Sequence, residues 1–304
     1  MNERNFSGID LNLLVVFAVV MRERSTTRAG AKLFLSQSAV SHALKRLRAL
    51  LDDELFVRVS QGVMPTPRAE GLYQDLLPCL DAIEAKLKER ETFDPASSDR
   101  TFRLGLPSSL DICLTPILLD RLAKQAPMIN LVIRPVDLHT GPGMIDAEEI
   151  DLGVSSFPRI ETWHRRRDLG PRNYACLFDR KRLGIKAPVT LADYLAAAHV
   201  LTSFSGDRTG VVDAALAERG LVRRVLVATP DFSSIPFYLA TAKAMATLPT
   251  YAAQVFADSL GLTYSALPFA VSDFMLSMIW HARLDQDAGH TWFRKLLAEI
   301  ALGI

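Results

Sequence analysis

The sequence has few of the residues that mark disulfide-stabilised, zinc-binding and membrane proteins. It contains three cysteines, Cys79, Cys113 and Cys176, which lie far apart and form no CxxC pair. This pattern indicates neither a disulfide framework nor a zinc site. The apolar run from Leu13 to Met21 has nine residues, and a membrane-spanning helix needs about 20. We therefore expect no membrane span.

Signatures of catalysis are missing as well. The sequence has no HExxH pair and no nucleophile elbow. Gly141-Pro142-Gly143 lacks the Lys-Ser/Thr that follows a phosphate-binding loop. We therefore expect a protein that is not an enzyme and that holds no cofactor and no metal ion.

A secretory signal peptide is the alternative to test for the run from Leu13 to Met21. Asp10 comes just before the run, and Arg22-Glu23-Arg24 follows it, where a cleavage site would need small residues. These flanks argue against export. We expect a cytoplasmic protein.

Length and composition indicate a globular protein of about two domains. The chain has 304 residues, of which 49% are apolar, and domains of about 100–200 residues are common. The segment from Thr92 to Asp99 is polar and contains proline and serine. It is the best candidate for a domain boundary.

The charge is balanced over the whole chain but not along it. There are 35 Lys and Arg against 34 Asp and Glu, a net charge of +1, and residues 92–304 carry 22 of each sign. The segment from Arg24 to Leu51 has no acid. Its six basic residues are Arg24, Arg28, Lys32, Lys45, Arg46 and Arg48. The near-zero average therefore does not exclude a polyanionic partner.

Three helices are predicted at the start of the chain, over 11–24, 27–34 and 38–51. Ser25 and Ser36 stand at the N-cap positions of the second and third helices. Ala29 and Gly30 allow close packing at the turn between these two helices. The third helix is amphipathic, because Val40, Leu44, Leu47 and Leu51 share one side of it, opposite Ser38, Ser41, His42 and Lys45.

A short helix, a turn and an amphipathic helix with basic residues form a helix-turn-helix, whose second helix enters the major groove of DNA. The alternative is a three-helix bundle whose charges only solvate its surface. Charge of one sign over the whole segment favours DNA binding. We expect four side chains to face bases: Gln37, Ser38, Ser41 and His42. Three cations would lie nearer the DNA backbone, Lys45, Arg46 and Arg48, and Arg28 would be a further contact. Arg58 would lie on a wing over 56–62.

A long helix follows, from Pro67 to about Arg90. Its leucines form an apolar stripe on one face. The stripe either packs on its own domain or pairs with a second copy, and a helix that leaves a small module favours pairing. The residues expected at this dimer interface are Leu72, Leu76, Leu80, Ile83 and Leu87.

Beyond residue 92, short apolar strands alternate with helices. The predicted strands are 102–106, 131–135, 150–154, 200–202, 222–228, 245–248 and 262–267, and the predicted helices include 109–125 and 210–219. This alternation is typical of an α/β sheet covered by helices.

The chain resembles the LysR-type transcriptional regulators over essentially its whole length. The match is strongest in IDLNLLVVF, TRAGAKLFLSQSAVSHALKRLRALLDDELFVR and GVMPTPRAEGL, which resemble a winged helix-turn-helix and the start of a linker helix. The segment LPFAVSDFMLSMIWHARLDQDAGHTWFRKLL is similar to the subgroup that answers to aromatic compounds and flavonoids. Two features depart from the family: Ser38 stands where proline is common, and the region from Tyr174 to Val189 is short.

The resemblance implies a fold class and a domain plan. An all-α-dominated winged helix-turn-helix over 1–66 and a dimerising linker helix over 67–91 would precede an effector-binding domain over 92–304. That domain would be α/β and like periplasmic binding proteins, with two Rossmann-like subdomains joined by two crossing strands. Subdomain I is expected at 92–167 and 268–304, and subdomain II at 168–267.

Ligands in such folds lie between the lobes, at strand ends and helix N-termini. Ser108 and Ser109 follow the first strand of the domain and begin its helix, so they are the leading candidates for effector contacts. Thr202, Ser203 and Phe204 would face them across the cleft, and Phe232 would add an aromatic wall. The simpler alternative is that Ser109 is an N-cap and Phe204 a core residue.

We therefore expect a DNA-binding regulator that a small organic acid or aromatic effector switches. Its partners would be double-stranded DNA with an interrupted palindrome, a second copy of itself in a dimer or tetramer, and RNA polymerase if it activates transcription. A periplasmic-type solute-binding protein is the alternative. It would share the second domain, but it would need an export signal.

Overall fold

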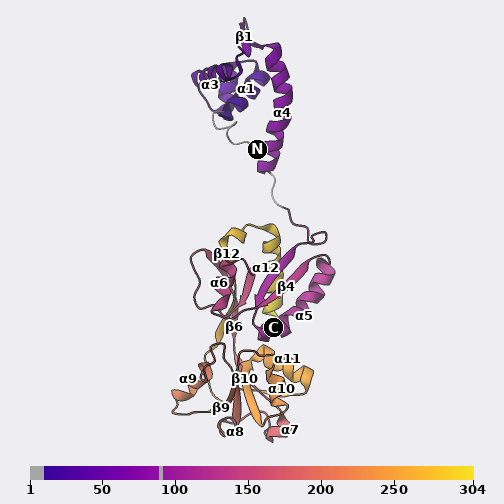
Figure 1. Cartoon of the computed structure of the whole chain (residues 1–304), viewed down its shortest axis with the longest axis vertical. Helices are drawn as coiled ribbons and strands as arrows, with labels where there is room; N and C mark the ends of the chain where they lie inside the picture. Colours follow the sequence, from indigo (N-terminus) through magenta and orange to yellow (C-terminus); the bar gives the residue numbers. More distant parts are fainter. Residues whose placement is uncertain (1–9, 89–91) are drawn as a thin grey trace. The chain divides into compact units, whose positions relative to one another are not determined.

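Contacts between residues divide the chain into two units, Met1–Arg90 and Glu91–Ile304. This computed structural model describes residues 10–88 and 92–304, and each unit is described by itself (Figure 1). The first nine residues of the expected DNA-binding domain, and residues 89–91 of the expected linker helix, lie outside the described part. In that part no helix is long and apolar enough to cross a membrane.

The first unit begins with the three predicted helices, α1 (Asn12–Glu23), α2 (Thr26–Leu33) and α3 (Gln37–Leu51). The two predicted N-caps are present, since the Ser25 and Ser36 side chains accept hydrogen bonds from the backbone N–H groups of Arg28 and Ala39. Apolar side chains of all three helices, including Phe17, Val40 and Leu47, form one core.

A two-stranded wing, β1 (Phe56–Val59) and β2 (Gly62–Pro65), follows α3. Gly62 has φ of +120°, and a Cβ atom there would lie 2.3 Å from the Arg24 carbonyl oxygen. Val63 N–H donates to the same oxygen at 3.1 Å. Glycine is therefore required where the wing meets the end of α1. The long helix α4 spans Pro67–Lys88.

The second unit contains two five-stranded sheets. The first has the order β4-β3-β5-β12-β6, with β3 (Thr101–Leu106), β4 (Asn130–Pro135), β5 (Leu152–Ser155), β6 (His164–Arg172) and β12 (Phe274–His281). Helices α5 (Ser108–Gln125) and α12 (Ala288–Leu302) pack on one face, and α6 (Thr140–Asp146) packs on the other (Figure 1).

The second sheet has the order β11-β7-β10-β8-β9. Alternate residues of β7 (Tyr174–Phe178) face opposite sides: Ala175 and Leu177 belong to one core, and Cys176 and Phe178 belong to the other. The other strands are β8 (Ala198–Thr202), β9 (Arg224–Thr229), β10 (Ala244–Pro249) and β11 (Thr263–Ala266). The helices are α7 (Arg180–Leu183), α8 (Leu191–Ala196), α9 (Val211–Ala217), α10 (Ile235–Leu239) and α11 (Thr250–Leu260).

The chain crosses between the two sheets twice. The first crossing runs from β6 through Asn173 into β7, and the second runs from β11 to β12. The expected subdomain boundary at 167/168 falls inside β6, so the first sheet continues to Arg172. The fold class is confirmed: a helical winged unit precedes two α/β subdomains.

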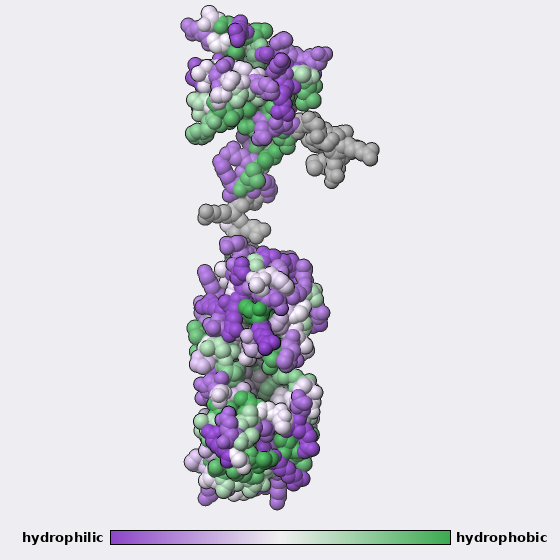
Figure 2. Space-filling view, turned by 90° about the vertical axis from the view of Figure 1, so that its left-hand side faces the viewer, coloured by the Kyte–Doolittle hydropathy of each residue, from purple (hydrophilic) through white to green (hydrophobic). Residues whose placement is uncertain are grey.

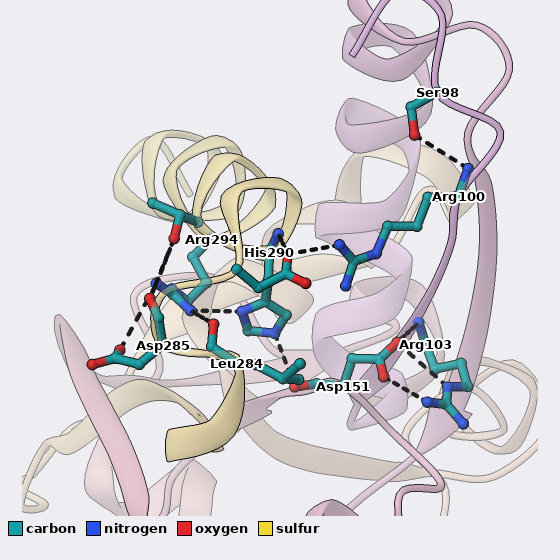
Figure 3. A network of polar contacts seen from close by, with 10 residues as sticks. Ser98, Arg100, Arg103, Asp151, Leu284, Asp285, His290 and Arg294 are labelled. Carbon is teal, nitrogen blue, oxygen red and sulfur yellow. Dashed lines mark hydrogen bonds and ion pairs between the residues drawn. The ribbon is translucent and has the colours of Figure 1, made fainter. Parts of the chain in front are cut away.

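A polar network ties the start of the second unit to α12 (Figure 3). Arg100 Nη1 donates to Asp287 Oδ1 at 2.6 Å, next to the N-terminus of α12. The His290 ring is fully buried, and it lies within hydrogen-bonding distance of the Asp151 carbonyl oxygen and of Arg294 Nη1, at 3.0 and 2.7 Å. Arg294 also lies over the Trp280 ring, 4.4 Å from its centroid. These bonds fix where α12 lies on the first sheet.

Candidate functional site

The exposed face of α3 carries the polar residues that the sequence singles out. Gln37, Ser38, Ser41, His42 and Lys45 are all exposed. Gln37 Nε2 donates to Ser41 Oγ at 2.9 Å, and it reaches Thr26 Oγ1 on α2 at 3.4 Å. Side chains of α2 and α3 thus form one hydrogen-bonding surface. Thr26 was not among the expected contacts, because in the sequence it looks like an ordinary helix-start residue.

The turn between α2 and α3 is as tight as its small residues suggest. A Cβ atom on Gly30 would lie 2.7 Å from the Leu35 carbonyl oxygen. Phe34 occupies the left-handed region, with φ of 58°, and its side chain is 97% exposed. This turn fixes the angle at which the N-terminus of α3 is presented.

Acids that lie outside the acid-free segment neutralise several of its cations. Glu23 pairs with Lys32 at 2.5 Å and with Arg28 at 3.6 Å. Asp10 pairs with Arg46 at 3.1 Å. The hydrogen bond from Lys32 holds the pKa of the Glu23 carboxyl below its usual value. A count of charges along the sequence could not reveal these pairs, because they form only in the fold.

Three other expected DNA contacts differ in their surroundings. Arg48 donates from Nε to the Glu54 carbonyl oxygen at 2.6 Å and from Nη2 to that of Phe56 at 3.2 Å. It therefore ties α3 to the wing. Lys45 is exposed, and no acid of the described residues pairs with it. Arg58 is exposed on β1 of the wing.

The apolar stripe of α4 divides into two parts. Leu72 and Leu76 pack against the core of their own unit. Ile83 and Leu87 are 53% and 82% exposed, and Leu80 is half-buried. Packing on the same domain therefore accounts for the first half of the stripe but not for its second half.

The second unit contains a cavity of about 330 Å³ between its two sheets. The space-filling view shows a recess at the level where the two sheets meet (Figure 2). Two pairs of aromatic rings line the cavity. The ring centroids of Phe204 and Phe232 lie 6.2 Å apart, and those of Tyr174 and Phe274 lie 5.2 Å apart. Flat apolar walls of this kind suit a planar ligand.

Four of the six expected effector contacts line this cavity: Ser109, Thr202, Phe204 and Phe232. Thr202 Oγ1 is buried without a hydrogen-bond partner among the described residues. Ser203 does not line the cavity. Its hydroxyl lies 3.5 Å from Ser205 Oγ.

Ser108 does not line the cavity either, because its hydroxyl joins the two subdomains. Ser108 Oγ donates to Asp231 Oδ1 at 2.6 Å and accepts from Phe232 N–H at 3.2 Å. Ser108 begins α5 on the first sheet, and Asp231 follows β9 of the second sheet. The serine pair therefore has two roles: Ser109 faces the cavity, and Ser108 links the lobes.

Of the described residues that line the cavity, Arg223 is the one that is charged, and it was not among the expected contacts. Its side chain is 1% exposed and pairs with both oxygens of Asp213 at 2.8 Å. Its Nη1 donates to Tyr194 Oη at 2.9 Å, and Tyr194 Oη lies 2.7 Å from Thr247 Oγ1. Burial disfavours the charge on Arg223, but the bonds to Asp213 keep its pKa raised. Arg223-Arg224 in the sequence resembles any surface pair, so no local signal marks it.

Comparison with known proteins gives two family matches. The profile described as "Bacterial regulatory helix-turn-helix protein, lysR family" matches residues 11–70, and the profile "LysR substrate binding domain" matches residues 95–301. Among the described residues, no cluster of three His, Cys, Asp or Glu side chains could hold a metal ion.

Similar proteins cover from two thirds of the chain to nearly all of it. The HTH-type transcriptional activator NagR of Ralstonia sp. is 36% identical over 96% of this chain and 97% of its own length. The regulatory domain of MexT, a transcriptional activator of Pseudomonas aeruginosa, is 34% identical with a TM-score of 0.60, over 66% of this chain and 99% of that domain. Full-length CbnR in complex with its target DNA shares the fold, with a TM-score of 0.54 and 17% identity, over 96% of this chain and 100% of that one.

Proposed function

Since this chain belongs to the LysR family of bacterial helix-turn-helix regulators, we propose that it binds an interrupted palindrome as a dimer and that a small molecule in the cavity between its subdomains switches it. The chain is a DNA-binding transcription regulator with an effector-binding domain, and it is not an enzyme, since its relatives are transcriptional activators.

The exposed polar face of α3 carries the proposal for DNA. A helix-turn-helix presents its second helix to the major groove, where side chains near the N-terminus of that helix reach base edges. Gln37, Ser38, Ser41 and His42 lie there, and their hydroxyl, amide and imidazole groups can read bases. Lys45 lies farther along the same exposed face, where a cation meets phosphates.

The experiment is binding to the DNA upstream of the protein's own or neighbouring gene, measured by fluorescence anisotropy across a salt series. The logarithm of affinity should fall steeply with the logarithm of salt concentration, because phosphate contacts release counterions. A scrambled duplex of equal length is the control. A flat salt dependence, or no binding at micromolar protein, would refute the proposal.

The effector is proposed to be an organic acid or an aromatic compound. The aromatic walls of the cavity and the unpaired Thr202 hydroxyl support a ligand at this place. The ligand would change the relative populations of subunit arrangements, and a coupling free energy of about 1–3 kcal/mol would suffice. We place the protein in the cytoplasm, where its DNA is.

Dimerisation is proposed to use α4. Exposed Ile83 and Leu87 continue the stripe beyond the part that packs on its own unit. A second α4 would bury them, and two dimers would pair into a tetramer. If the protein activates transcription, it would also contact RNA polymerase. The relative NagR is named as a transcriptional activator.

A further inference from the structure

Among the described residues that line the cavity between the subdomains, no cation is left unpaired for an acidic ligand. Of the residues in its lining, Arg223 alone carries a charge. Both oxygens of Asp213 already neutralise it, and Tyr194 Oη accepts a further hydrogen bond from it. An entering carboxylate would therefore meet a guanidinium whose charge a buried two-point ion pair already neutralises, with the like charge of Asp213 beside it.

The N-terminus of α9 is closed to an anion by the same aspartate. Gly210 N–H, at the start of α9, donates to Asp213 Oδ2 at 2.8 Å. Asp213 therefore holds the position that a ligand carboxylate would take at both Arg223 and α9.

A second aspartate stands at the start of α5. Asp231 accepts from Ser108 Oγ at 2.6 Å, and Ser233 Oγ donates to its other oxygen at 2.5 Å. Burial opposes its charge, but these hydrogen bonds hold its pKa below the usual value. Because Asp231 is negative beside Phe232 of the cavity wall, it repels a second carboxylate there.

Arg172 is another cation near the cavity, since it acts electrostatically on the buried Tyr251 phenol. Its Nη atoms donate to the carbonyl oxygens of Pro171 and Ala301, at 2.9 and 2.7 Å. It does not belong to the cavity lining. Backbone carbonyl oxygens thus hold both Nη atoms, whereas the buried Nε has no hydrogen-bond partner among the described residues. The case against an acidic ligand therefore concerns the residues that line the cavity.

The other side chains of the lining are aromatic, aliphatic or hydroxyl-bearing, and none of them carries a charge. Ser109, Thr202 and Thr247 contribute hydroxyls, and Thr202 Oγ1 has no partner among the described residues. A hydroxyl donates or accepts, so it pairs with an uncharged oxygen at little cost, whereas a buried carboxylate without a cation is strongly disfavoured.

We propose that this cavity takes an uncharged aromatic molecule carrying hydroxyl or carbonyl groups and discriminates against aromatic carboxylates. The proposal rests on the proposed effector role of the same cavity and decides between the two ligand classes named there. Asp213 and Asp231 are the residues that set this selectivity.

The test uses matched pairs of probes with the full-length protein: benzamide and benzoate, and naphthol and naphthoate. Dissociation constants are measured by calorimetry and by thermal stabilisation. The uncharged member of each pair should bind the wild-type protein at least about tenfold more tightly. Equal or tighter binding of the carboxylates would overturn the inference, and so would binding of neither member of either pair.

The variant Asp231→Asn shows where the selectivity resides. The asparagine keeps an oxygen that accepts from Ser108 but removes the negative charge, so binding of benzoate should improve by about tenfold while that of benzamide changes little. Unchanged discrimination in this variant would contradict the role assigned to Asp231.

Asp213→Asn should shift the preference further toward carboxylates, because it leaves Arg223 without its counter-charge. Its fold is checked by circular dichroism, since a buried guanidinium without a partner destabilises a protein. The double variant Asp213→Leu with Arg223→Met removes the pair together and should keep the wild-type preference for uncharged probes. A double variant that prefers carboxylates would overturn the inference.

Anisotropy with the upstream DNA is measured on the same samples. DNA binding that persists while the probe preference fails refutes the ligand class alone. Loss of salt-dependent DNA binding in the wild-type protein would instead refute the proposed function itself.

Discussion

At the scale of single residues, the exposed face of α3 separates two kinds of DNA contact. Ser41 and His42 lie near its N-terminus, where base edges are read, and Lys45 lies one turn farther along. Ser41→Ala or His42→Ala should reduce discrimination between operator and scrambled DNA by about 1–3 kcal/mol, whereas Lys45→Ala should weaken both duplexes alike and flatten the salt slope by about one.

Anisotropy on the two duplexes measures both effects. Lys32→Ala is a matched control, because Glu23 already neutralises Lys32. If Lys45→Ala changed the preferred sequence instead, the assignment of α3's polar face would be wrong.

Ser108 shows how one side chain can link two lobes. Since its hydroxyl donates to the Asp231 carboxylate, Ser108→Ala should lower the stability of the second unit by about 1.5–3 kcal/mol, the usual contribution of a hydrogen bond to a charged group. Urea unfolding of the full chain measures this change.

The control for Ser108 is Ser203→Ala. The Ser203 hydroxyl lies 3.5 Å from that of Ser205, so its loss should cost less than about 0.5 kcal/mol. Equal destabilisation by the two substitutions would argue against the link through Asp231.

At the scale of elements, the turn between α2 and α3 depends on Gly30. A Cβ atom there would lie 2.7 Å from a backbone oxygen, which cannot move without moving α3. Gly30→Ala should therefore destabilise the first unit by about 1–3 kcal/mol despite the better helix propensity of alanine. Gly71→Ala, in α4 with nothing within 4 Å, should stabilise it by up to about 1 kcal/mol. Thermal melting of the two variants measures these changes in stability. A Gly30→Ala variant that is more stable than the wild-type protein would show that the turn is looser than described.

The helices of the first unit could be predicted because local signals specify them. Ser25 and Ser36 cap α2 and α3, and the apolar side of α3 is evident in Val40, Leu44 and Leu47. Strands β6, β7 and β12 were not predicted. β6 contains three successive arginines, 165–167, and a glycine and a proline, so its strand character depends on pairing with β12, far away in the sequence.

The cavity was harder to predict than the DNA-binding face. Ser109, Thr202, Phe204 and Phe232 stand at strand ends and helix starts, where a general rule for α/β sheets points. Arg223 could not be found that way, because its importance comes from burial beside Asp213 and Tyr194. Which cations are neutralised is likewise a property of the fold.

At the scale of the whole molecule, two buried histidines predict a dependence of stability on pH. Burial lowers the pKa of His199 and of His290 to about 4, from an ordinary 6.5. Between these values the unfolded chain binds protons that the folded chain does not, so stability falls as the pH falls. Each histidine should lower the free energy of unfolding by about 1.4 kcal/mol per pH unit in this window. Over the whole window, each should lower it by about 3 kcal/mol.

Urea unfolding of the full chain across this pH range measures the slope. His290→Gln, whose amide can donate to the Asp151 carbonyl and accept from Arg294, should lose about half of it. A stability that stays constant or rises on acidification would contradict the burial of these two rings as neutral groups.

The return of the chain to its first sheet has a consequence for synthesis on the ribosome. β12 lies between β5 and β6 in that sheet, and α12 covers one of its faces. All strands of the second sheet leave the ribosome before β12 does. The nascent protein therefore carries an unfinished first subdomain until β12 and α12 have been made. A premature stop anywhere before Phe274 would leave β6 without its neighbour in the sheet and α5 without α12.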